Sequence, residues 1–259
     1  VGGLLPATRY EYRVVYRGEK LANRVVIETP PVPGVAKSFS FAAMADLRSY
    51  DGPSQQDAVK AQLSEALLKK GAEFVIFAGD VSNESGTSSE YYQHYFKVYD
   101  ELQRMIPFYP IQGNHDLYPA KFLNLFESSN GYYFFNLLTL PHNPAAEAIE
   151  HWDPVQKKNV KGYSSFYSFD WASTHFVALD HTSIEPGTLG FESYGKDSAQ
   201  YAWLEADLKK AQGARWRIAY FHNPPVMNQA PDIELMQLMA DHNVDLIVAG
   251  HIESPSLHL

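Results

Sequence analysis

Five short apolar segments of the chain are each followed by a polar residue of a metal-binding type, and no other feature constrains the fold as much. Two of them, Phe74–Ala78 (FVIFA) and Leu246–Ala249 (LIVA), have the length and composition of buried strands. Segments with helical periodicity lie between them. Strands that alternate with helices predict an α/β fold with helices on both faces of a sheet. The polar residues that follow the five segments are Asp46, Asp80, Asn114, His222 and His251.

The helices are predicted from apolar periodicity and from capping signals. Residues 55–70 begin after Ser54, a suitable N-cap, and end at Gly71. Further helices are expected at about 90–105, 199–211 and 233–242. Tyrosines recur at helical spacing in the first of these, which predicts core packing for Tyr91, Tyr92, Tyr95 and Tyr99. Strands are expected at 37–45, 74–78, 108–111, 163–169, 175–179, 215–221 and 246–249.

The first part of the chain has a different pattern. Residues 10–16 and 25–29 read as two strands that flank a polar turn at 17–20. Because a lone hairpin is marginally stable in water, this piece must pack on something else. Residues 30–34 (PPVPG) form a stiff linker. We therefore expect a separate segment at 1–34 and a main domain at 35–259.

Composition excludes several classes of protein. The net charge of −9 argues against a nucleic-acid binder, which needs a basic surface. No apolar run reaches the roughly 18 residues that a membrane-spanning helix needs. The chain has no cysteine, so it forms neither disulfides nor thiolate metal sites.

The side chains at the five strand ends suit a metal site. In an α/β fold the carboxyl ends of the strands share one edge of the sheet, where ligands bind. Carboxylate, amide oxygen and imidazole together favour Zn, Mn or Fe(II). Asp80 is the natural bridge between two cations, because Gly79 lets the backbone approach closely. Taken singly, Asp46, Asp80 and Asn114 also fit helix N-caps.

The motifs around these residues resemble those of the calcineurin-like metallophosphoesterases from about residue 39 to residue 253. The later runs SSFYSFDWASTHFVALD and QYAWLEADLKKA resemble the purple acid phosphatase branch. This resemblance implies an α/β fold with a metallophosphoesterase-type β-sandwich core flanked by helices. Segment 1–34 resembles the end of a fibronectin type III domain, with Tyr10 near its corner-tyrosine position. The metallophosphoesterase motifs are Gly79-Asp80, Gly113-Asn114-His115-Asp116, His222-Asn223-Pro224-Pro225 and Gly250-His251.

The resemblance also implies a role for each matching residue. One metal ion would be held by Asp80, Asn114, His222 and His251. The other would be held by Asp46 and Asp80 with further ligands. His115 would donate a proton or a hydrogen bond to the phosphate or the leaving oxygen, and Asp116 would orient His115.

Three residues depart from the family pattern, all near the second metal. Arg48 stands where many members have a histidine, and it could bind a phosphate oxygen. Asn83 stands where purple acid phosphatases have the tyrosine that gives their colour, so we predict that this protein is not purple and that Asn83 lies near the substrate. Glu253 replaces a histidine and can still ligate through oxygen, which would make that site more tolerant of Mn, Mg or Ca.

The resemblance predicts a phosphoester hydrolase, more suited to phosphomonoesters than to phosphodiesters, that uses metal-bound hydroxide and two divalent or trivalent ions (Fe, Zn or Mn, with Mg or Ca as alternatives). The sequence leaves open whether the altered metal position is filled. The alternative is a catalytically impaired relative with a binding or surface-assembly role. The expected partner is a small phosphorylated substrate, and the expected location is secreted, periplasmic or cell-surface. The chain is expected to be part of a longer protein; substrate identity and oligomeric state are not predicted.

Overall fold

The structure is a computed structural model of the 259-residue chain. It describes residues 2–46, 53–82, 86–117, 131–153, 155–182, 194–225 and 229–252, with the backbone alone at 53–58 and 152.

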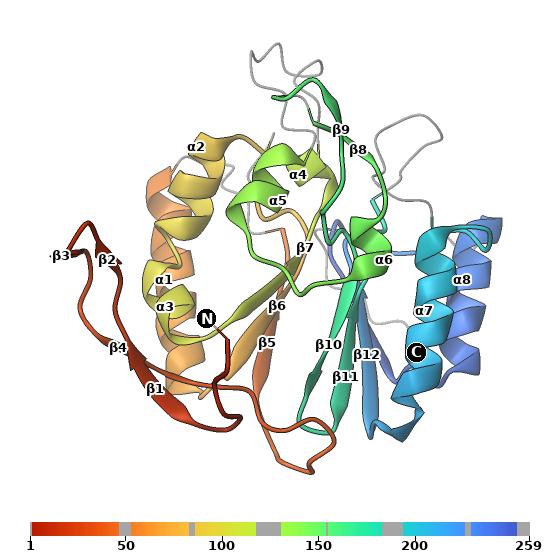
Figure 1. Ribbon diagram of the computed structural model, residues 1–259, viewed down its shortest axis with the longest axis horizontal. Helices are drawn as coiled ribbons and strands as arrows, with labels where there is room; N and C mark the ends of the chain where they lie inside the picture. Colours follow the sequence, from red (N-terminus) through yellow and green to blue (C-terminus); the bar gives the residue numbers. More distant parts are fainter. Residues whose placement is uncertain are drawn as a thin grey trace.

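Two β-sheets pack face to face and form the centre of the molecule (Figure 1). The first sheet is parallel and contains β5 (Phe41–Met44), β6 (Phe74–Ala78) and β7 (Phe108–Ile111) in that order. In the second sheet β10 is antiparallel to β11, and the remaining neighbours are parallel. Its strands are, in order, β10 (Tyr167–Trp171), β11 (Thr174–Ala178), β12 (Trp216–Phe221) and β13 (Leu246–Ala249).

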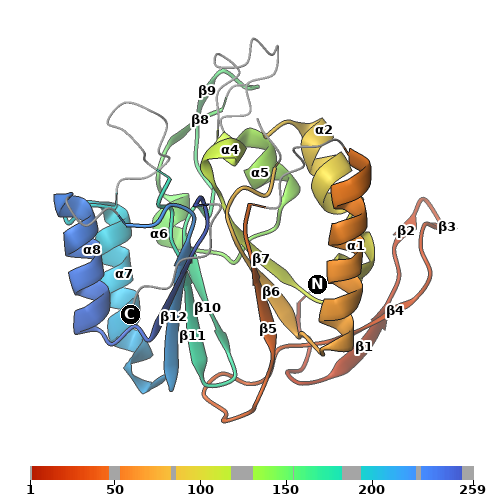
Figure 2. The same cartoon turned by 180° about the vertical axis from the view of Figure 1, so that it is seen from behind.

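Helices cover the outer face of each sheet, as the two opposite views show (Figures 1 and 2). The second sheet carries α7 (Ala199–Lys210), followed by the 3₁₀ turn Ala211–Gly213, and α8 (Ala230–Asp241). Shorter elements lie in sequence between the last strand of the first sheet and the first strand of the second. They are α4 (Asn114–Leu117), α5 (Tyr132–Leu137), α6 (Pro144–Glu147), β8 (His151–Asp153) and β9 (Lys158–Val160). The first sheet carries α1 (Pro53–Lys69), α2 (Ser88–Glu90), the π-helical turn η1 (Tyr91–Phe96) and α3 (Asp100–Met105).

Strand β6 packs against the second sheet on one face and against the helices of the first sheet on the other. Phe74, Ile76 and Ala78 point to the second sheet, and Val75 and Phe77 point to the helices of the first. All five side chains are buried, so the strand is apolar throughout and does not alternate with polar residues. Complete burial of a valine, isoleucine or phenylalanine side chain stabilises the fold by about 1.5–3 kcal/mol.

The two-sheet core confirms the α/β sandwich that the family resemblance implies. The strand–helix alternation alone predicts helices on both faces of a sheet, and this is wrong for each sheet taken separately. Each sheet buries one face against helices and the other against its partner sheet. The aromatic side chains between the sheets are the physical cause: Phe74 lies 4.4 Å from Trp171 and 5.3 Å from Phe176, between ring centroids.

Several predicted boundaries change. The helix expected at 90–105 is divided into α2, η1 and α3, because its middle turn is π-helical, with the Lys97 amide bonded to the Tyr92 carbonyl. The strand expected at 163–169 begins at Tyr167, and Asp170 and Trp171 are paired strand residues, since the hairpin turn has only two residues. The first strand of the main domain is limited to Phe41–Met44 by the start of its partner β6.

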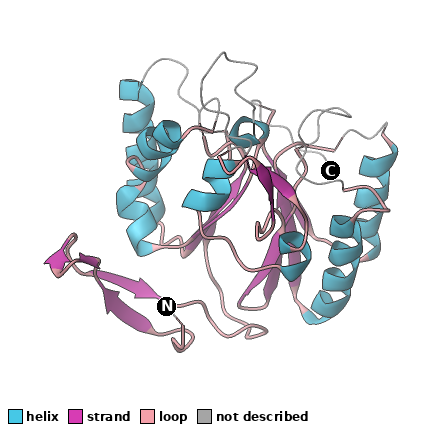
Figure 3. Cartoon of the chain, turned by 45° about the horizontal axis from the view of Figure 1, so that its top comes forward, coloured by secondary structure: helices cyan, strands magenta, loops and turns pink. Residues whose placement is uncertain are grey.

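The N-terminal segment forms two short antiparallel pairs at the edge of the molecule (Figure 3). They are β1 (Arg9–Tyr12) with β4 (Val25–Glu28) and β2 (Val15–Tyr16) with β3 (Glu19–Lys20). The Leu5 amide donates a hydrogen bond to the Tyr10 hydroxyl at 2.9 Å. The hydroxyl of a corner tyrosine likewise bonds to the backbone a few residues upstream. Assignment to a fibronectin type III domain, and the boundary at residue 34, stay predictions.

None of the helices in the described ranges has both the length and the apolar character needed to cross a membrane.

A buried histidine joins the second sheet to α7. Nδ1 of His175 lies 2.7 Å from Asp170 and Nε2 lies 3.0 Å from Asp207. Burial by itself favours the neutral ring, but the hydrogen bonds and charges of the two carboxylates outweigh it and raise the pKa of His175 to about 9. The charged ring therefore binds both carboxylates at neutral pH.

We predict that His175 stabilises the fold at neutral pH and not at alkaline pH. Because the pKa is raised on folding, the stabilisation is complete below the ordinary value of about 6.5 and is lost as the pH rises through about 9. The difference in melting temperature between the wild type and His175→Gln should shrink across this range. Asp207→Asn should show the same trend. A difference that stays constant with pH would contradict the prediction.

Candidate metal centre

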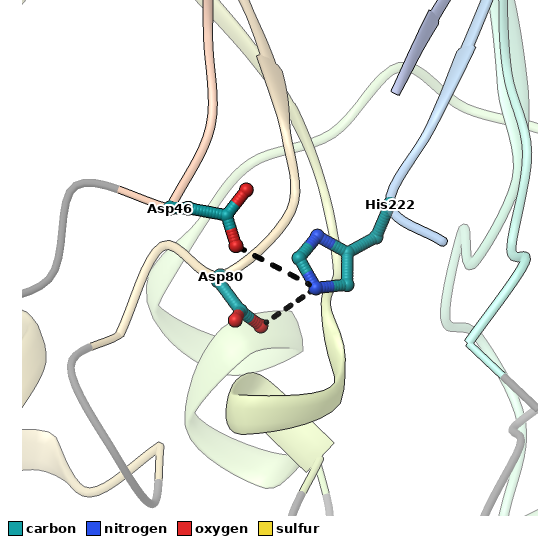
Figure 4. A group of neighbouring side chains, drawn as sticks. All are labelled: Asp46, Asp80 and His222. Carbon is teal, nitrogen blue, oxygen red and sulfur yellow. Dashed lines mark ion pairs between the residues drawn. The ribbon is translucent and has the colours of Figure 1, made fainter. Parts of the chain in front are cut away.

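The five residues predicted from the strand ends lie together at one edge of the two sheets. Asp46 follows β5, Asp80 follows β6, Asn114 begins α4 after β7, His222 follows β12 and His251 follows β13. Each strand runs parallel to its neighbours, so the carboxyl ends meet at this edge. Figure 4 shows Asp46 and Asp80 from the first sheet pointing at the ring of His222 from the second.

The ligand atoms converge on a small volume. One ligand atom each from Asp46, Asp80 and His222 lie within 4.8 Å of one another. Nε2 of His222 is 2.9 Å from Asn114 Oδ1, 3.3 Å from Asp80 Oδ1 and 3.9 Å from Asp46 Oδ1. Nδ1 of His251 is 3.1 Å from the same Asn114 oxygen. Oxygen and imidazole nitrogen atoms that converge in this way are of the types that bind a metal ion together.

The ring of His222 is oriented by the backbone of the other sheet. Its Nδ1 lies 3.0 Å from the carbonyl oxygen of Ala78, which can only accept a hydrogen bond. Nδ1 therefore carries a proton, and Nε2 faces the carboxylates. A ring fixed in this way by a carbonyl is the usual arrangement of a metal-binding histidine.

The site concentrates negative charge in a buried position. The side chains of Asp80 and His222 are fully buried, and that of Asp46 is 12% exposed. Burial tends to raise the pKa of Asp80, but the hydrogen bond and charge of His222 and the charge of His115 lower it. Burial tends to lower the pKa of His222, and Asp80 and Asp46 raise it. Two carboxylates so close favour a bound cation.

Three of the five residues have a strained backbone. Asp46, Asp80 and His251 adopt left-handed φ angles of 52°, 53° and 68°. This conformation costs a residue other than glycine roughly 1–2 kcal/mol, and it is found at functional sites where the surroundings enforce it. Part of that enforcement is a 2.7 Å hydrogen bond from the His251 amide to Asp46 Oδ2.

Glycines before the ligands make room for other ligands. A Cβ atom on Gly79 would lie 2.5 Å from the His222 ring, and one on Gly250 would lie 2.5 Å from Asp46 Oδ2. A Cβ atom on Gly113 would collide with Asp80. Each glycine is therefore required by a side chain from a neighbouring strand end, which explains the recurrence of glycine in the sequence motifs.

His115 and Asp116 lie beside the converging ligands. The His115 amide donates to Asp80 Oδ1 at 2.9 Å, and its ring, 17% exposed, lies 3.9 Å from Asp80. Asp116 is fully buried and accepts three backbone amides, from Val81 at 3.1 Å and from Ser82 and Gly113 at 2.8 Å. Burial, and secondarily the charge of Asp80, raises the pKa of Asp116 to about 6.

The sequence did not identify a further donor to Asp116. The Tyr91 hydroxyl donates to its Oδ1 at 2.7 Å. Core packing, as predicted, is found for Tyr91, Tyr95 and Tyr99, but Tyr92 is 59% exposed. Helical spacing alone carries no signal that distinguishes Tyr91 from its neighbours.

Three predicted site residues lie outside the described part of the chain: Arg48, Asn83 and Glu253.

Comparison with known proteins agrees with the fold and the motifs. Residues 39–255 match the family model of the calcineurin-like phosphoesterases. The chain is 26% identical to purple acid phosphatase 21 of Arabidopsis thaliana over 98% of its own length and 51% of the relative's. It is 23% identical to the Fe(3+)-Zn(2+) purple acid phosphatase 12 of the same plant, over 95% and 49%. The chain thus spans about half the length of these curated relatives.

A solved structure has a similar fold. A dimetal phosphatase from Danio rerio superposes with a TM-score of 0.50 over 82% of this chain and 81% of that one, at 13% sequence identity. At this identity the likeness concerns the fold alone.

We predict that Gly79→Ala disrupts the metal centre. The added Cβ would displace the His222 ring, and the backbone at φ +85° disfavours alanine. Affinity for Mn²⁺, measured by calorimetric titration, should fall at least about tenfold, or about 1.4 kcal/mol. Gly213→Ala is the matched control, because nothing lies within 4 Å of the added atom. Unchanged Mn²⁺ affinity in a folded Gly79→Ala protein would show that the centre does not depend on this contact.

Proposed function

Because the chain belongs to the calcineurin-like phosphoesterase family, we propose that it hydrolyses phosphoric esters with two metal ions bound at the strand ends. The observation that carries this proposal is the convergence of Asp46, Asp80 and His222 within 4.8 Å. Asp80 and His222 are completely buried there, although such groups are unfavourable in a protein interior without compensation.

The ligands divide into two sets that share Asp80. We assign one metal to Asp80, Asn114, His222 and His251, which the 2.9 and 3.1 Å contacts around Asn114 support. We assign the other to Asp46 and Asp80, with Glu253 as a further ligand. Oxygen and nitrogen donors without thiolate suit Fe, Zn or Mn, and one relative is named as an Fe(3+)-Zn(2+) enzyme.

When bound, the two ions would polarise the phosphoryl oxygens and lower the pKa of a bound water. The protein's own groups would position the reaction. The Ala78 carbonyl holds the His222 ring, and Asp80 holds the His115 amide, so the partly exposed His115 ring stands at the edge of the centre. There it would donate a hydrogen bond or a proton to the phosphate or to the leaving oxygen. Asp116 would act by fixing the turns beside the centre.

We propose a small phosphorylated substrate, and a phosphomonoester in preference to a phosphodiester. Arg48 is proposed to bind a phosphate oxygen, with Asn83 nearby. The likeness to purple acid phosphatases supports this substrate class. The secreted, periplasmic or cell-surface location stays a prediction from the sequence.

A second candidate function is binding without catalysis. It is favoured by one observation: Arg48, Asn83 and Glu253 all depart from the family pattern at the metal position that includes Asp46. In that case the chain would hold one metal or none and would not turn over substrate.

Metal analysis together with hydrolysis of a generic aryl phosphate separates these functions. We predict that Asp80→Ala abolishes metal binding and turnover together, with at least about a hundredfold loss of kcat/KM, since Asp80 is shared by both ligand sets. Asp197→Ala, at an exposed position, is the control. Turnover retained by Asp80→Ala would refute the bridging role. Less than about one metal per wild-type chain, without activity in added Mn, Zn or Fe, would favour binding without catalysis.

A further inference from the structure

One buried carboxylate joins the two turns that carry proposed metal ligands. Asp116 accepts hydrogen bonds from the Val81 and Ser82 amides, which directly follow Asp80. It also accepts one from the Gly113 amide, which directly precedes Asn114. Its orientation therefore sets the relative position of these two turns.

The second turn is held to the first in return. Oδ1 of Asp80 accepts the His115 amide at 2.9 Å. Each turn thus contributes a carboxylate that binds backbone amides of the other. A rotation of Asp116 would release both the segment after Asp80 and the segment before Asn114, and the two ligands would no longer be held at a fixed separation.

The Tyr91 hydroxyl is a side-chain donor that holds this carboxylate from outside the two turns. It is 2.7 Å from Asp116 Oδ1, and Tyr91 has no exposed surface. Tyr91 is the first residue of the π-helical turn η1, in which the Lys97 amide reaches back to the Tyr92 carbonyl. π-Helical turns are rare and are frequently found at functional sites.

We propose that Tyr91 is a positioning residue for the metal centre, whose hydroxyl fixes Asp116 and thereby the turns that carry Asp80 and Asn114. The effect on metal binding and turnover rests on the proposed function. The effect on the two turns rests on the hydrogen bonds alone.

Tyr95 provides a matched control on the same π-helical turn. It is 2% exposed and packs its ring against Phe77 at 6.1 Å and Phe108 at 6.0 Å. Within the described part of the chain, no hydrogen bond links its hydroxyl to the turns of the centre. Tyr91→Phe and Tyr95→Phe therefore each remove one buried hydroxyl from the core between the first sheet and its helices. Only Tyr91→Phe removes a hydrogen bond to Asp116.

The first measurement is amide hydrogen exchange in the metal-free protein. Tyr91→Phe should speed exchange at Val81, Ser82 and Gly113 at least about tenfold, and Tyr95→Phe should leave these amides unchanged. The melting temperatures of the two variants test whether both remain folded. Equal exchange at the three amides in both variants would overturn the proposal, whether or not the protein is an enzyme.

The second measurement is metal affinity and kinetics. Tyr91→Phe should weaken Mn²⁺ binding about tenfold and lower kcat with little change in KM, as expected for a group that acts through another. In the double variant with Asp116→Asn, the loss should be no larger than for Asp116→Asn alone. Additive losses would overturn the route through Asp116. A wild type without metal or turnover would refute the proposed function, and the exchange measurement would still decide the role of Tyr91.

Discussion

The hydrogen bond from His222 to the Ala78 carbonyl joins the two sheets at the edge where the candidate metal ligands converge, and it fixes the ring that Asp46, Asp80 and Asn114 surround. It requires that Gly79 have no side chain, because a Cβ atom there would occupy the place of the imidazole ring. It also requires a fixed spacing between the sheets, which the packed aromatic side chains of the core provide. Two parts of the sequence that lie 144 residues apart are thus brought together by core packing and one missing Cβ atom.

The same edge holds the groups that are least favourable to the fold. Asp46, Asp80 and His251 have left-handed backbones, and the carboxylates of Asp80 and Asp116 are fully buried. Such features persist when the surroundings enforce them. Here the enforcement is reciprocal, since Asp116 binds the turn after Asp80 and Asp80 binds the amide of His115. The strain is therefore distributed over turns that stabilise one another.

The sequence predicted the strand ends and the fold class, because strand composition and the polar residue that follows are local features. It did not predict what depends on contacts between distant elements. Helical periodicity at 90–105 was correct for burial of Tyr91 and Tyr95, but neither the π-helical turn nor the bond from Tyr91 to Asp116 leaves a local pattern. Alternation of strands and helices likewise does not reveal that there are two sheets. The separation into two sheets depends on contacts between aromatic side chains that are distant in the sequence. Only the resemblance to a family predicted it.

The geometry of Asp46 bears on whether a metal ion binds at the position where Arg48, Asn83 and Glu253 depart from the family pattern. Its carboxylate is 12% exposed, lies 3.9 Å from His222 Nε2 and accepts the His251 amide. Its backbone is left-handed, a conformation that persists where the surroundings enforce it. A carboxylate held this close to the buried Asp80 also raises the repulsion within the site, which a cation would remove. The placement of Asp46 therefore supports the proposed second metal ion, held by oxygen donors.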